Sequence, residues 1–185
     1  MDRTDFVEMS KQSKRQSVKR VNGWPSAMPD SLLSILVDTR EQNPWNFASC
    51  FGELQKRVDT VKFGDYCLEI DPHLAAVERK SLSDFVACQG RERERFRTQI
   101  GKMVGVVERP LVIVEADYSH MEIGGWRGRM TPEQVLAGLH STLNNVPVLL
   151  CRSRGEAERA CYRHLRAALK NRYSQCREFA RRLQA

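Results

Sequence analysis

Short apolar runs separated by polar turns recur along the middle of the chain. Runs of this length, bounded by turn-forming residues, are typical of β-strands. The pattern predicts strands at residues 32–38, 58–63, 66–70, 75–78, 111–115 and 148–151. The turn-forming sequence Asp71-Pro72-His73 joins two of these runs, which we expect to pair as antiparallel neighbours. The run at 111–115 is continuous in apolar residues, as expected of a strand that is covered on both faces.

Helical patterns lie between and after these runs. Ser81 and Ser83 are candidate N-caps of a short helix that Gly90 interrupts, and Thr131 followed by Pro132 begins another helix. The apolar face of this second helix is expected to contain Leu136, Leu139, His140 and Leu143. Further helices are expected at residues 48–57, 91–104 and 155–183, the last in one piece or broken near Asn171. The predicted elements together indicate an α/β domain.

Two carboxylates and a lysine stand at the ends of neighbouring apolar runs. Asp65 follows Gly64 directly, and Glu78 closes the next run but one. Lys80 lies two positions beyond Glu78, so it projects to the same face of a strand. Carboxylate oxygens are the ligands that Mg²⁺ prefers, and a lysine beside a bound ion can position the water that attacks a phosphate. The pattern therefore indicates a metal-dependent nuclease.

A second acidic cluster, V-D-T-R-E at residues 37–41, follows the first predicted strand. Together with F-G-D-Y at 63–66 and V-E-R-K-S-L-S-D-F at 77–85, it resembles the nuclease domain of the XPF family, whose signature is G-D…E-R-K-x-x-x-D. Arg95 and Gln99 match the R-x-x-x-Q of the family's next helix. The resemblance covers roughly residues 32–170.

This resemblance implies a restriction-endonuclease-like α/β fold, a central mixed sheet flanked by helices. It implies a DNA endonuclease that depends on Mg²⁺, with Mn²⁺ as a substitute, and that cuts branched, flapped or junction DNA. Asp65, Glu78 and Asp38 would hold the ion, and Lys80 would orient the attacking water. Arg40 and Arg79 would hold the phosphate or the acidic side chains. The complete set of catalytic candidates is Asp38, Arg40, Glu41, Asp65, Glu78, Arg79, Lys80 and Asp84.

Candidate DNA contacts lie outside this acidic set. Arg95 and Gln99 are implied by the resemblance, and Arg91 stands beside them. Trp126, in a glycine-rich loop expected at 120–129, would either stack on a frayed base or, as we favour, cover the core. The stretch after Cys151 is the most basic of the chain, which favours phosphate contacts. The candidate DNA-binding residues are Arg91, Arg95, Gln99, Trp126, Arg177, Arg181 and Arg182.

Composition and charge agree with these expectations. The chain has 185 residues, 41% of them hydrophobic and 29% charged, which suits one globular domain with tails. A formal net charge of +7 suits a polyanionic partner. The six cysteines form no C-x-x-C pair and are expected to be reduced core residues of an intracellular protein. No segment reads as a secretion signal or as a membrane span.

Three segments are expected: a basic arm at residues 1–31, the nuclease domain at 32–170 and a basic helical tail at 171–185. No helix-hairpin-helix repeat is visible in the tail, so the basic segments or a partner protein would hold the duplex. The resemblance also implies a homodimer, for which Leu165, Ala168 and Leu169 offer an apolar surface. Two alternatives stay open: a catalytically silent DNA-binding or scaffold subunit, and a nicking or homing-type nuclease.

Overall fold

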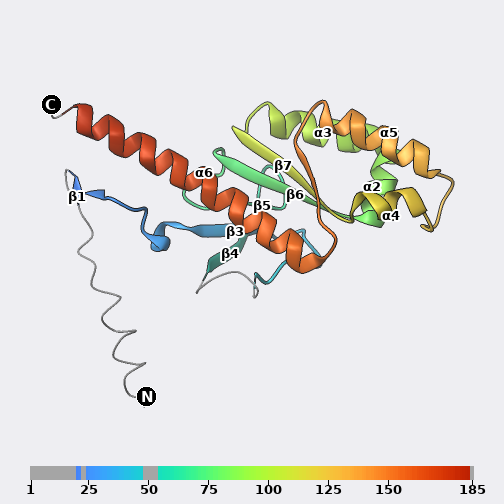
Figure 1. Ribbon diagram of the computed structural model, residues 1–185, viewed down its shortest axis with the longest axis horizontal. Coiled ribbons are helices and arrows are strands. Elements are labelled where there is room, and N and C mark those ends of the chain that lie inside the picture. The colour runs from blue at the N-terminus through green and yellow to red at the C-terminus, as the bar shows by residue number, and fades with distance from the viewer. Residues whose placement is uncertain (1–19, 22–23, 48–53, 184–185) are drawn as a thin grey trace, which may run out of the picture. The chain divides into compact units, whose positions relative to one another are not determined.

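The structure, a computed structural model, describes residues 20–21, 24–47 and 54–183. Its larger unit, Asp30–Asn171, is built on one mixed sheet (Figure 1). The strands are β3 (Ser34–Asp38), β4 (Gln55–Asp59), β5 (Tyr66–Leu68), β6 (Ala75–Ser81), β7 (Arg109–Glu115) and β8 (Val148–Leu150). They lie in the order β4-β3-β5-β6-β7-β8, with β5 antiparallel to both of its neighbours and the other pairs parallel. The predicted mixed sheet and the antiparallel pair around Pro72 are confirmed.

Helices cover both faces of this sheet (Figure 1). The helical elements are the short 3₁₀ turn η1 (Asp30–Leu32), α2 (Leu82–Gln89), α3 (Arg93–Val104), α4 (Tyr118–Ile123), α5 (Pro132–Leu143) and α6 (Arg154–Arg182). Helices α2, α3, α4 and α5 gather on one side of the sheet, and the first part of α6 runs along the other (Figure 1). The sheet is therefore the middle layer of an α/β sandwich, as the sequence predicts.

Alternation along the strands divides the core between these two faces. Cys67, Ala76 and Val112 pack with Phe85 of α2 and Phe96 of α3 in one apolar cluster. The intervening strand residues point to the other face, where buried side chains of α6 cover them. The cysteines predicted to lie in the core are free and buried, namely Cys67, Cys88, Cys151 and Cys161, whereas Cys176 is exposed.

Local capping fixes two helix starts where the sequence places them. The Ser81 hydroxyl accepts a hydrogen bond from the backbone N–H of Asp84 at 3.1 Å, which begins α2. Thr131 and Gln134 form a reciprocal capping box at the start of α5, with Pro132 in its first turn. Both predicted helix starts are confirmed, because each depends on contacts among residues only three positions apart.

Other local expectations are wrong. Residues 48–53 of the expected helix at 48–57 lie outside the described part of the chain, and from Gln55 the chain forms β4 rather than a helix or a strand at 58–63. The expected loop at 120–129 begins inside α4. In α5 the buried face is Val135, Leu139 and Thr142, so His140 and Leu143 are exposed. Helix α6 passes Asn171 without a break.

The apolar side chains proposed for a dimer surface require a further correction. Leu165, Ala168 and Leu169 are each at most 5% exposed. They face inward because α6 is amphipathic and uses this stripe to cover its own unit. A contact between two subunits must therefore use other residues.

The second unit combines the described residues up to Pro29 with those from Arg172 onward. Strands β1 (Arg20–Val21) and β2 (Trp24–Pro25) pair antiparallel in it. The Trp24 and Tyr173 rings lie 5.2 Å apart between centroids, and the Tyr173 hydroxyl donates to the Pro25 carbonyl at 2.7 Å. Residues 1–19 of the predicted basic arm lie outside the described part of the chain. None of the described helices has the length and apolar character needed to cross a membrane.

Candidate active site

A glycine positions the first carboxylate beside β6. Gly64 has φ +74°, and a Cβ atom at this position would lie 2.7 Å from the Val77 carbonyl oxygen. Only glycine accepts both the conformation and the close approach. The next residue, Asp65, donates its backbone N–H to the Val77 carbonyl at 2.8 Å and accepts from the Arg79 N–H through Oδ2 at 2.7 Å. The Asp65 side chain is thereby fixed to the strand that carries Glu78 and Lys80.

Glu78 is the most deeply buried acidic side chain of this group, at 1% exposure. Its Oε1 accepts a hydrogen bond from Lys80 Nζ, and its Oε2 accepts from Gln99 Nε2 of α3 at 2.7 Å. The Lys80 ammonium also lies 5.7 Å from the centroid of the Phe96 ring. The predicted projection of Glu78 and Lys80 to one face of the strand is confirmed by their contact.

The electrostatics of this group favour a bound cation. Burial and, next, the negative charge of Glu78 raise the pKa of Asp65 to about 7. Burial opposes the charged form of Lys80, but Glu78 and Asp65 outweigh it and the pKa of Lys80 lies above its usual value. Lys80 is therefore protonated at neutral pH and offsets only part of the paired negative charge. A divalent ion would relieve the rest.

Asp38, at the end of β3, is also almost fully buried but has a dedicated partner. It accepts from the Arg40 backbone N–H at 2.8 Å and from Arg40 Nε at 3.0 Å. Although burial raises it, the pKa of Asp38 is held below its usual range by these bonds. The same guanidinium donates to the Val61 carbonyl at 2.8 Å. Asp38 is therefore ionised and shares its charge with Arg40.

These side chains line one cavity of about 330 Å³. Seven of the candidates predicted from sequence meet in it: Asp38, Arg40, Asp65, Glu78, Lys80, Arg95 and Gln99. The sequence analysis missed Lys62 and Lys102, which add two cations to its wall. Lys102 lies three positions after Gln99 and seven after Arg95, so helical spacing alone could have indicated it. We call this space the catalytic cavity.

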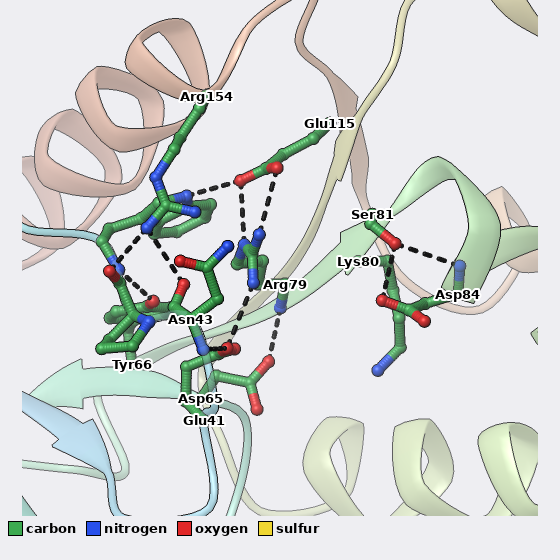
Figure 2. A network of polar contacts seen from close by, with 12 residues as sticks. Glu41, Asn43, Asp65, Tyr66, Arg79, Lys80, Ser81, Asp84, Glu115 and Arg154 are labelled. Atoms are coloured by element: carbon green, nitrogen blue, oxygen red, sulfur yellow. Dashed lines mark hydrogen bonds and ion pairs between the residues drawn. The ribbon is translucent and has the colours of Figure 1, made fainter.

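Arg79 and Glu41 lie apart from the catalytic cavity, on the opposite side of β6. The Arg79 side chain, 10% exposed, donates to Glu115 through Nε at 2.8 Å and to Glu41 through Nη1 at 3.1 Å. Trp45 Nε1 donates to the same Glu115 carboxylate at 2.6 Å. Figure 2 shows the Arg79 side chain between Glu115 and Glu41, and Lys80 pointing away from them. Arg79 thus holds acidic side chains, one of the two roles expected of it.

The remaining candidates are spread over other surfaces. Asp84 is exposed in the first turn of α2 and accepts from the Ser81 hydroxyl at 2.6 Å (Figure 2). Arg91 is exposed and lies 3.7 Å from Glu92. Trp126 is half-buried, packs against the core cluster and donates to the Met130 carbonyl at 2.9 Å, as a residue that covers the core would. The three C-terminal arginines belong to the second unit, namely Arg177, Arg181 and Arg182.

Two carboxylates suit a magnesium ion, because Mg²⁺ binds through one or two carboxylates and keeps several waters. Asp65 and Glu78 supply this donor set, and the half-buried position of Asp65 raises its affinity for charge of the opposite sign. Within the described ranges, no cluster of three or more acidic, histidine or cysteine side chains suited to a metal ion occurs. An ion would therefore depend on Asp65, Glu78 and water, with Asp38 acting through a water or after a shift of Arg40.

The fold is that of known XPF nucleases, a restriction-endonuclease-like α/β fold. XPF from Aeropyrum pernix superposes with a TM-score of 0.59 at 21% identity, covering 79% of this chain and 69% of that chain. Its complex with DNA gives a TM-score of 0.56 at 20% identity, with 75% and 66% covered. The family model of the ERCC4 domain matches residues 37–162, so the chain belongs to the ERCC4 domain family. No curated protein sequence gives a significant match.

Proposed function

We propose that the chain is a metal-dependent DNA endonuclease that cuts at branched, flapped or junction structures. The observation that carries this proposal is the catalytic cavity, in which Asp65, Glu78 and Lys80 meet beside four further cationic side chains. Membership of the ERCC4 domain family supports the class of enzyme, and one of the similar structures is a complex with DNA. A phosphodiester is the natural ligand of a cavity that joins a cation site to several exposed cations.

The chain's own residues would divide the work of hydrolysis. Asp65 and Glu78 would hold Mg²⁺ or Mn²⁺, and a bound ion of this kind lowers the pKa of water and neutralises charge on phosphoryl oxygens. Lys80 is protonated, so it would donate a hydrogen bond to the attacking water rather than take its proton. The water oxygen would bond to phosphorus while one P–O ester bond breaks, leaving a hydroxyl and a phosphomonoester. Arg40, Arg95 and the two cavity lysines would hold the phosphates.

The test is cleavage of matched duplex, flap, fork and four-way-junction DNA with Mg²⁺, Mn²⁺ or EDTA. We expect Glu78→Gln to lose at least about a hundredfold in turnover and to bind DNA as before, since a charge developing in the transition state loses its counter-ion. Glu94→Gln, which neutralises an exposed acid of α3 outside the cavity, serves as the matched control. Wild-type turnover in Glu78→Gln would contradict the assignment. Binding without any metal-dependent cleavage by the wild type would favour a catalytically silent subunit.

We propose in addition that the chain acts as a homodimer. The surface that supports this is not the buried stripe of α6 but the free edge of the sheet at β8, where Leu149 is exposed beside Pro147. A groove between this strand and α6 is lined by both apolar and basic side chains, among them Arg159 and Arg163. Light scattering should give twice the 21.3 kDa chain mass, and Leu149→Lys should halve it. A single-chain mass at micromolar concentration, with and without DNA, would rule the dimer out.

A further inference from the structure

Helix α3 separates the catalytic cavity from a second cavity. Arg95, Gln99 and Lys102 line the catalytic cavity, whereas residues on an adjoining face of the same helix line a space of about 240 Å³ between α2, α3 and α5. We call this space the α3–α5 cavity. Among its lining residues are Gln89, Arg93, Phe96, Arg97, Ile100 and Gly101. The two cavities are therefore one helix width apart.

An unpaired donor lies in the wall of the α3–α5 cavity. Gln89 is 8% exposed, and its Nε2 has no hydrogen-bond partner among the described residues. A buried amide without a partner is costly, and native proteins rarely keep one unless water or a ligand completes it. Gly138 of α5 explains why the side chain stays in place, because a Cβ atom there would lie 2.3 Å from Gln89 Oε1. The fold thus makes room for Gln89 at the wall of a cavity that its own residues do not satisfy.

The rest of the lining is amphipathic. Phe96 and Ile100 supply apolar wall, and the Phe96 ring also contacts the Lys80 ammonium of the catalytic cavity. Arg93 and Arg97 lie one turn apart on α3, and both are exposed without a carboxylate partner in the described part of the chain. A ligand that fits must be flat and apolar on its faces, carry an acceptor on its edge and be attached to negative charge.

Size selects among such ligands. A volume of 240 Å³ equals roughly eight water molecules in the liquid. It is below the usual range of sites for drug-sized molecules, about 300–1,000 Å³. One heterocyclic base matches it, and the two arginines would meet the phosphates on either side of that base.

We propose that the α3–α5 cavity receives one unpaired base of the DNA strand whose phosphate lies in the catalytic cavity. The base would enter beside Phe96 and Ile100, accept a hydrogen bond from Gln89 Nε2 and leave its flanking phosphates on Arg93 and Arg97. This inference rests on the DNA binding proposed above. It adds a physical basis for preferring substrates with unpaired nucleotides, because a base held in a duplex is not free to enter.

The test is an abasic scan of forked DNA, with affinity measured by fluorescence anisotropy in EDTA. An abasic analogue replaces one nucleotide at a time along each unpaired arm. For the wild type we expect one position at which the analogue weakens binding by about tenfold, the size of one base stacked on protein side chains. Gly101→Leu should fill the cavity, because a Cβ atom at Gly101 meets no atom within 4 Å. This variant and Gln89→Met should bind intact DNA more weakly and lose the position dependence.

Thr98→Leu is the matched control, since Thr98 is exposed on α3 and lines neither cavity. It should keep the wild-type scan, and circular dichroism should show that all three variants stay folded. A flat wild-type scan, or a position dependence that survives in Gly101→Leu, would overturn the proposal. A flat scan together with tight binding of free deoxynucleoside monophosphate would assign the cavity to a free nucleotide instead.

The two proposals fail in different ways. Metal-dependent cleavage with a flat scan would remove the base site and leave the endonuclease. A position-dependent scan without cleavage in Mg²⁺ or Mn²⁺ would keep the base site and remove the endonuclease. Absence of any DNA binding by the wild type would overturn both.

Discussion

The substitution Asp65→Asn tests whether the carboxylates of the catalytic cavity destabilise the metal-free protein. Burial, together with the charge of Glu78, raises the pKa of Asp65 to about 7 from an ordinary value of 3.8. A carboxyl with a raised pKa holds its proton longer in the folded than in the unfolded protein. Its contribution to stability is therefore complete below pH 3.8 and is lost as the pH rises through 7.

The size of the effect follows from the two pKa values. Their difference corresponds to on the order of 4 kcal/mol of unfolding free energy, at about 1.4 kcal/mol for each pH unit. The catalytic cavity admits water and the Lys80 ammonium lies nearby, so we expect roughly 1–2 kcal/mol to be observed. Asparagine keeps an oxygen that can accept from the Arg79 N–H but carries no charge. The variant should thus be more stable than the wild type at pH 8 and should not cleave DNA.

Urea unfolding in EDTA at several pH values between 5 and 8 measures this effect as the difference between the two proteins. That difference should grow with pH, and added Mg²⁺ should stabilise the wild type while leaving Asp65→Asn unchanged. Glu94→Gln, which removes an exposed acid of α3, should follow the wild type. Parallel pH profiles for the wild type and Asp65→Asn would refute the reasoning, because they would show that the Asp65 carboxyl is ionised without cost.

Three further outcomes are expected. Gly138→Ala should destabilise the protein by about 1–3 kcal/mol in urea unfolding, because its Cβ atom would lie 2.3 Å from Gln89 Oε1, and an unchanged midpoint would contradict that close approach. Burial lowers the pKa of His164, whose Nε2 lies 3.0 Å from the Arg109 carbonyl, so its contribution to stability is present above pH 6.5 and lost as the pH falls. The decrease in unfolding free energy between pH 7 and 5 should therefore be smaller in His164→Gln than in the wild type. Neutralising Arg177, Arg181 and Arg182 should flatten the slope of log K against log salt by up to about 0.9 for each phosphate that is no longer neutralised, with turnover at saturating DNA preserved.

The sequence predicts best what depends on close neighbours along the chain. The start of α2 at Ser81 and the projection of Glu78 and Lys80 to one face both follow from spacings of two or three residues. Strand β4 was missed because every residue of Gln55–Asp59 is exposed at the edge of the sheet. An edge strand with no buried face has no apolar alternation to reveal it.

Contacts between distant segments account for the other gaps. Arg79 was recognised by its motif, but its place in the structure depends on Glu115, 36 positions later. The cavity wall at Lys62 and the unpaired Gln89 likewise depend on how separate segments meet, which the sequence pattern does not specify. A motif therefore located the chemistry of the catalytic cavity, whereas tertiary packing decided which motif residues reach it.

The two faces of β6 have opposite electrostatic characters. On one face Asp65 and Glu78 gather negative charge that is only partly offset by Lys80. On the other face Arg79 pairs with two carboxylates and lies 5.7 Å from the Trp45 ring centroid. Because Arg79 is adjacent to Glu78 on one strand and its N–H holds Asp65, its well-paired side chain helps to keep both carboxylates in place. A loss of cleavage in an Arg79 variant would therefore not identify a phosphate contact, since displacement of this strand would disturb the catalytic cavity in the same way.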